Sequence, residues 1–66
     1  MNGNMDTEII FDIYEGLEIP LKAKAIVRNG FLIKIKLLFN AGRKDLYHFI
    51  NDAGITFAEL HPEIRN

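Results

Sequence analysis

The sequence predicts an α+β fold in which a three-stranded antiparallel meander is followed by C-terminal helices packed on one face. Hydrophobic and polar residues alternate in three segments, 7–15, 19–28 and 31–39, as they do in half-buried strands. A hydrophobic stripe with helical spacing follows the third segment. The 66 residues form a single small domain, 1–66, because a chain of this length can build only one core. We expect residues 1–5 to be disordered.

The alternation assigns each predicted strand a buried face and an open face. In the first segment, Ile9, Phe11 and Ile13 lie on one side, and Ile10 and Tyr14 lie on the other. The two later segments each supply a further hydrophobic row to the buried face. These rows are Leu21, Ala23, Ala25 and Val27, then Phe31, Ile33, Ile35, Leu37 and Phe39.

The lengths of the two turns follow from keeping these hydrophobic rows on one face. Asn29-Gly30 is typical of a two-residue type I′ turn, but such a turn would place lysines among the hydrophobic side chains. A three-residue loop over 28–30 pairs Val27 with Phe31 and keeps the rows together. We therefore expect a three-residue loop here and, by the same reasoning, at 15–17.

Two helices are predicted after the sheet. The first covers 43–53 and ends at Gly54, a residue that often lies just beyond a helix C-terminus. Thr56 and Glu59 have the spacing of a capping box, which predicts a second, short helix over 57–61. The hydrophobic stripe of the first helix consists of Leu46, Phe49, Ile50 and Ala53.

Charge is strongly segregated along the chain, although the net charge is only −1. The segment 19–44 contains seven cations and no anion, and acids dominate on both sides of it. The cations are Lys22, Lys24, Arg28, Lys34, Lys36, Arg43 and Lys44. Such a basic stretch affects both how the strands pair and what the surface can bind.

The composition argues against catalysis. The chain has no Ser and no Cys, which removes the commonest nucleophiles and any thiolate metal site. His48 and His61 lack the spacing of a metal-binding pair. We expect no enzyme activity, no metal and no cofactor. The absence of Cys, of a signal peptide and of a long apolar run leads us to expect a cytoplasmic protein and no membrane contact.

The open face of the sheet is the predicted functional surface. A short helical segment covers only one face of three strands, so hydrophobic side chains remain among lysines on the other. We expect a protein-interaction module, either a homodimer or a small regulator or inhibitor that docks on a larger protein, of bacterial or phage origin. The predicted partner-binding residues are Tyr14, Ile26, Leu32, Leu38, Lys24, Lys34 and Lys36.

Nucleic-acid binding is the alternative function. The lysines of the second and third segments form a basic strip, with an arginine at the tip of the hairpin. The sequence pI of about 6.0 and the aliphatic neighbours of the strip argue against it. The residues of this alternative are Lys22, Lys24, Arg28, Lys34 and Lys36.

Overall fold

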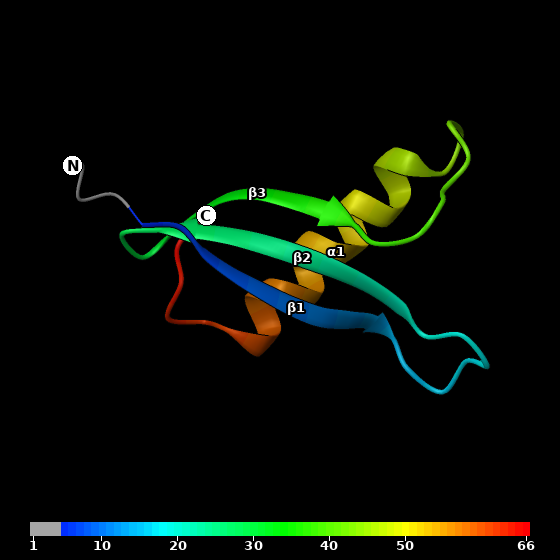
Figure 1. Cartoon of the computed structure of the whole chain (residues 1–66), viewed down its shortest axis with the longest axis horizontal. Coiled ribbons are helices and arrows are strands. Elements are labelled where there is room, and N and C mark those ends of the chain that lie inside the picture. Colours follow the sequence, from blue (N-terminus) through cyan, green and yellow to red (C-terminus); the bar gives the residue numbers. More distant parts are fainter. Residues whose placement is uncertain (1–4) are drawn as a thin grey trace.

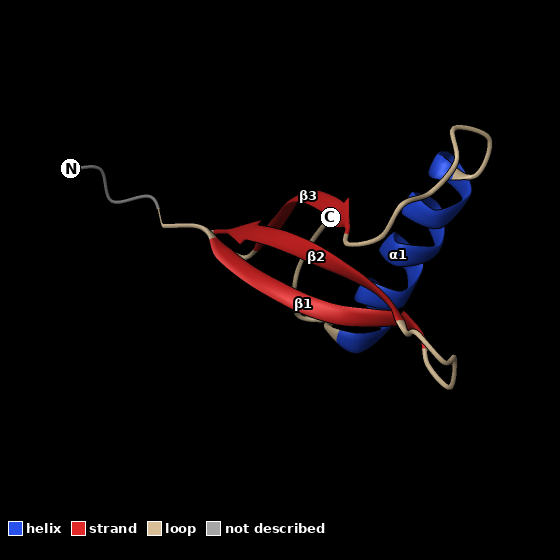
Figure 2. Cartoon of the chain, turned by 45° about the vertical axis from the view of Figure 1, so that its right-hand side comes forward, coloured by secondary structure: helices blue, strands red, loops and turns tan. Residues whose placement is uncertain are grey.

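A three-stranded antiparallel sheet and one helix on one of its faces make up the fold, as the sequence predicts. The computed structural model describes residues 5–66, so all of the predicted disordered segment 1–5 except Met5 lies outside the described residues. The strands lie in the order β1-β2-β3, and α1 crosses behind the sheet obliquely (Figures 1 and 2). The elements are β1 (Thr7–Tyr14), β2 (Leu21–Arg28), β3 (Phe31–Leu37) and α1 (Leu46–Leu60).

The helical segment is one continuous helix of 15 residues, so the predicted break at Gly54 is wrong. Gly54 has no left-handed backbone, and it lies in the interior of α1. An interior glycine costs a helix roughly 1 kcal/mol relative to alanine. The burial of Ala53 and Phe57 on either side of Gly54 offsets this cost, since large buried side chains contribute several kcal/mol. The helix ends instead at His61, whose N–H donates to the carbonyl of Phe57.

The turn between β2 and β3 has two residues, not the predicted three. Asn29 and Gly30 both have a positive φ, 55° and 81°, which is the conformation of a type I′ turn. Arg28 therefore pairs with Phe31. A β-bulge then restores the hydrophobic alignment, because Ile33 is an extra residue with no partner on β2.

Beyond this bulge the hydrophobic rows face the same side, as predicted, but the register is offset by two residues. Ala25 pairs with Ile35, whereas a three-residue loop that pairs Val27 with Phe31 would pair it with Ile33. Only one lysine pair, Lys24 with Lys36, is directly opposed.

The connection between β1 and β2 is longer than the predicted three-residue loop. It covers residues 15–20, and Tyr14 pairs with Leu21 after a bulge at Ile13. Pro20 closes this connection outside the strand, so it removes no hydrogen bond from the sheet. Both hairpins therefore bring their hydrophobic rows to one face through a β-bulge, although one turn is shorter and the other longer than predicted.

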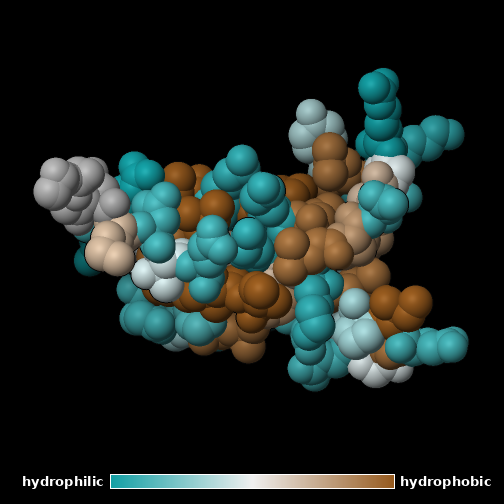
Figure 3. All heavy atoms as spheres, viewed as in Figure 1, coloured by the Kyte–Doolittle hydropathy of each residue, from teal (hydrophilic) through white to brown (hydrophobic). Residues whose placement is uncertain are grey.

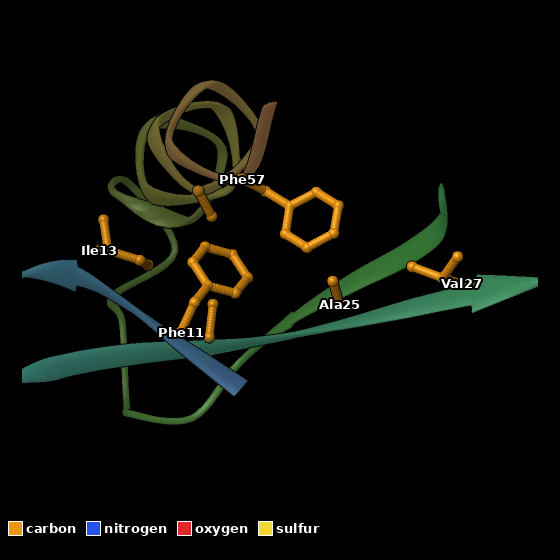
Figure 4. Packing of buried hydrophobic residues seen from close by; sticks show 7 residues of the cluster. Phe11, Ile13, Ala25, Val27 and Phe57 are labelled. Carbon is orange, nitrogen blue, oxygen red and sulfur yellow. The ribbon is translucent and has the colours of Figure 1, made fainter. Parts of the chain in front are cut away.

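The core lies between α1 and the central part of the sheet (Figure 4). Ala23 and Ala25 of β2 and Ala53 of α1 are fully buried, and their small side chains let the helix approach the sheet closely. Phe57 is the one large side chain of the described residues that is completely buried. Its ring contacts that of Phe11, with centroids 5.3 Å apart.

Candidate functional site

Most of the predicted partner-binding residues lie on the open face of the sheet. Ile26 pairs with Lys34, and Lys24 pairs with Lys36, on the side opposite the buried alanines. Leu38 follows β3 and is 46% exposed. These five residues are therefore brought together as predicted.

Leu32 and Tyr14 do not belong to this face, and both are displaced by the bulges. Leu32 pairs with buried Val27 and packs against the core, since the extra residue in β3 reverses the alternation before it. The Tyr14 hydroxyl donates a hydrogen bond to Asp52 of α1, and its ring meets Phe49 edge-on at 6.4 Å. Both side chains therefore turn toward the helix.

Ion pairs with β1 engage the lysines of the central strand. Lys22 binds Asp12, and Lys24 Nζ lies 3.4 Å from a carboxylate oxygen of Glu8. These partially exposed pairs each contribute roughly 0–1 kcal/mol to stability. Their larger effect is to neutralise much of the predicted basic strip.

Arg28, at the end of the same strand, forms a two-point ion pair with Asp6. Its Nε and Nη2 lie 2.7 and 3.2 Å from the two carboxylate oxygens. The hydrogen bond from Arg28 lowers the pKa of Asp6, and the same contact raises the pKa of Arg28. Both groups stay charged at neutral pH, so Arg28 already has an anionic partner.

The lysines of β3 differ from those of β2. Among residues 5–66, no acid lies within ion-pairing distance of Lys34 or Lys36. The cations of the open face therefore divide into a neutralised central row and an unneutralised row along β3. Figure 3 shows this face, on which hydrophilic side chains interrupt the hydrophobic ones.

A hydrophobic groove lies at the other side of β3, between this strand and α1. It has a volume of about 540 Å³, and its mouth carries Ile33 and Ile55, which are 52% and 54% exposed. Gly54, which has no side chain, and Ala58, which has only a methyl group, form part of its helical wall and leave the space open. A second hollow adjoins it toward the end of β3, since Ile35 and Ile50 line both.

The backbone of β3 is available along this groove. The Leu38 N–H donates to the carbonyl of Lys22, and Lys36 has the same orientation because alternate residues of an antiparallel strand point the same way. The N–H and C=O groups of Ile35 and Leu37 therefore point away from β2, toward the outer edge.

The start of the same edge is already occupied by the chain itself. Leu32 N–H donates to the carbonyl of Arg65 at 2.6 Å, and Arg65 N–H donates to the carbonyl of Gly30 at 2.9 Å. Phe31 and Arg65 thus form a short parallel bridge. The outer edge accepts an extended segment here, and the rest of it, 33–37, continues past Asn66 along the groove.

One polar cluster lies on α1. Asp52 accepts from Tyr14 and has His48 Nε2 at 3.3 Å. The hydrogen bond and the nearby carboxylate raise the pKa of Tyr14. His61 Nδ1 lies near Glu63, at 3.5 Å, in a separate place. Within residues 5–66, no three acidic or imidazole groups converge to hold a metal ion.

The chain matches no family model, no curated protein and no solved structure at a significant level. In the described part of the chain, the helix is neither long enough nor apolar enough to cross a membrane.

The groove does not follow from the predicted elements, in which Ile33 belongs to the core and the first helix ends before Ile55. The sequence does contain a signal for the bulge at Ile33 and one for the longer helix. Asn29-Gly30 indicates the two-residue turn, which forces a bulge if the hydrophobic rows are to meet. Phe57, four residues after Ala53, continues the helical stripe through Gly54.

Proposed function

We propose that the chain is a non-catalytic protein-interaction module that binds another protein at the outer edge of β3. The observation that carries this proposal is the groove, where Ile33 and Ile55 are half-exposed beside backbone groups that lack a strand partner. Large apolar side chains gathered at an open strand edge are typical of sites where an extended segment joins a sheet.

The groove is better suited to a partner than the open face. On the open face, Ile10, Ile26 and Leu38 are separated by charged side chains, several of them ion-paired. A partner there would have to desolvate these pairs, whose cost is not repaid by isolated hydrophobic contacts. At the groove, the hydrophobic side chains are adjacent, and no ion pair of the described residues needs to be broken.

Nucleic-acid binding has less support. Three of its five predicted residues, Lys22, Lys24 and Arg28, have acidic partners, which lie on β1 or directly before it. Each of these cations would have to break its existing ion pair to bind a phosphate, which reduces its contribution to affinity.

A capture experiment with two matched variants tests the proposal. Ile33→Asp places a charge at the groove, and Ile10→Asp places the same charge on the open face, at another exposed isoleucine of a strand. From lysate of the source cell treated with nuclease, the tagged wild type and Ile10→Asp should retain the same protein band. Ile33→Asp should lose it while keeping the wild-type circular dichroism spectrum.

Two results would count against this assignment. A band lost only with Ile10→Asp would place the site on the open face. A band that disappears from the wild type after nuclease treatment would favour the nucleic-acid alternative.

A further inference from the structure

We infer that the outer edge of β3 selects an extended acidic segment of another protein, in which hydrophobic residues alternate with Glu or Asp. This inference rests on the proposed function and specifies the chemistry of the partner. It combines three features of one strand: unpaired lysines on its open side, a hydrophobic groove on its helix side, and free backbone groups between them.

The alternation of side chains in a strand matches these features to two sides of the partner. A segment added to residues 33–37 would direct every second side chain toward the groove, beside Ile33, Ile50 and Ile55. The intervening side chains would lie on the open side, next to Lys36 and Lys34, the second of which also contributes to the lining of the groove. Hydrophobic residues fit the first set and carboxylates fit the second, because the two lysines lack an acid among the described residues.

The same lysines argue against a second copy as the occupant. Symmetric antiparallel pairing of two β3 strands about Ile35 would oppose Lys34 of each copy to Lys36 of the other. Pairing about either lysine would oppose that lysine to itself. Like charges directly opposite one another are destabilising, and edge lysines commonly prevent such pairing.

The acidic edge of a second copy is also a poor occupant. β1 carries Glu8 and Asp12, but these acids already bind Lys24 and Lys22. The hydrophobic row of β1, including Phe11 and Ile13, is buried under its own helix and cannot enter a neighbour's groove. A segment with free acidic and hydrophobic side chains meets both requirements.

The chain provides its own example of strand addition at this edge. Arg65 forms backbone hydrogen bonds with Gly30 and Leu32, and Ile64 beside it packs against the core. The start of the β3 edge is therefore already bound by one residue of the chain itself, Arg65, in an isolated parallel bridge. The partner would continue this arrangement along the strand.

Three dye-labelled peptides test the inference directly. The first is acetyl-Gly-Glu-Val-Glu-Val-Glu-Gly-amide, the second replaces each Glu with Lys, and the third reorders the first as Gly-Glu-Glu-Glu-Val-Val-Gly. Fluorescence anisotropy should show at least about tenfold tighter binding of the first than of either other peptide. Amide NMR shifts on binding should be largest at Ile33, Ile35 and Leu37.

A charge reversal with a matched control separates the β3 lysines from net charge. Lys34→Glu/Lys36→Glu should weaken binding of the acidic peptide by at least about tenfold and favour the lysine peptide. Arg43→Glu/Lys44→Glu makes the same change in net charge in the exposed loop before α1, and should alter the affinity by less than about threefold. These measurements belong at about 0.15 M salt, where distant charges are screened.

Several outcomes would overturn the inference. Equal loss of affinity in both double variants would show a general charge effect. Amide NMR shifts that are largest at Ile10 and Ile26 would place the peptide on the open face. Light scattering that shows a stable oligomer, with the β3 amides insensitive to peptide, would make a second copy the occupant.

The two proposals can fail separately. If no acidic peptide binds but Ile33→Asp still abolishes capture of a protein, the groove is a binding site for a different chemistry. If Ile33→Asp leaves capture unchanged, the proposed function itself is wrong.

Discussion

Replacing Gly54 with alanine should stabilise the protein, because Gly54 lies inside a continuous helix. Alanine is favoured over glycine in a helix interior by roughly 1 kcal/mol. No atom lies within 4 Å of a Cβ added at Gly54, so the substitution has no steric cost to subtract. We therefore expect Gly54→Ala to raise the free energy of unfolding by about 0.8–1 kcal/mol, which corresponds to about 4–8 °C in Tm for a domain of this size.

Gly30→Ala is the matched control, since an added Cβ there also has no atom within 4 Å. The decisive difference at Gly30 is its backbone, which has a φ of +81° in the type I′ turn. A left-handed backbone costs a residue with a Cβ about 1–2 kcal/mol. Gly30→Ala should therefore lower the stability by about that amount, and the two alanine variants should move in opposite directions.

Urea denaturation followed by circular dichroism at 222 nm measures both variants under the same conditions. A decrease in stability for Gly54→Ala similar to that for Gly30→Ala would refute the reasoning. It would mean that Gly54 ends a helix in a left-handed conformation, and that the helical segment is two short helices. The continuous groove wall formed by Ile50, Gly54 and Ala58 would then also be wrong.

Three further predictions concern the core and two exposed contacts. Phe57→Ala should lower the free energy of unfolding by about 3–5 kcal/mol, which is comparable to the whole stability of so small a domain. It should abolish the cooperative melting transition, which Phe57→Leu should retain. A normal transition for Phe57→Ala would contradict the assigned core. The phenol absorbance of Tyr14 near 295 nm should titrate above its ordinary pKa of 10.0, and Asp52→Asn should lower that midpoint. The Tyr14–Asp52 contact stabilises the fold below pH 10 and is lost as pH rises through the folded pKa of Tyr14. An unchanged midpoint in Asp52→Asn would exclude the hydrogen bond. Asp6 has a lowered pKa, so its contact with Arg28 stabilises the fold above the ordinary pKa of 3.8, and this stabilisation is lost as pH falls through the folded pKa. Asp6→Asn should therefore reduce the loss of stability in acid. An acid profile identical to that of the wild type would show that the pair contributes nothing.

The predicted fold class, strand order and one-sided helix are confirmed, because each follows from local patterns with a fixed period. The alternation around Phe11 and around Ala25 identifies the buried side of β1 and β2 without knowledge of their neighbours. The structure adds two ion pairs between β1 and β2 that the patterns do not specify, Glu8 with Lys24 and Asp12 with Lys22.

The errors lie where two local rules conflict. Asn29-Gly30 favours a turn of two residues, whereas the hydrophobic rows of β2 and β3 share a face only if the turn has an odd number of residues or a strand has a bulge. A three-residue turn, as predicted, would satisfy the rows alone, whereas the protein satisfies both rules with a two-residue turn and a bulge at Ile33. The same kind of bulge at Ile13 turns Tyr14 toward the helix.

Sequence alone determined which residues form the strands, their order, and the separation of a buried face from a charged one, since these depend on periodicity within each segment. Only the tertiary structure decided the register, the continuity of α1 through Gly54, and the exposure of Ile33 and Ile55 at the groove. The physical reason is that these features depend on balances between distant parts of the chain. The burial of Phe57 against Phe11 offsets the cost of a helical glycine, and the pairing of β3 with β2 offsets the cost of a bulge.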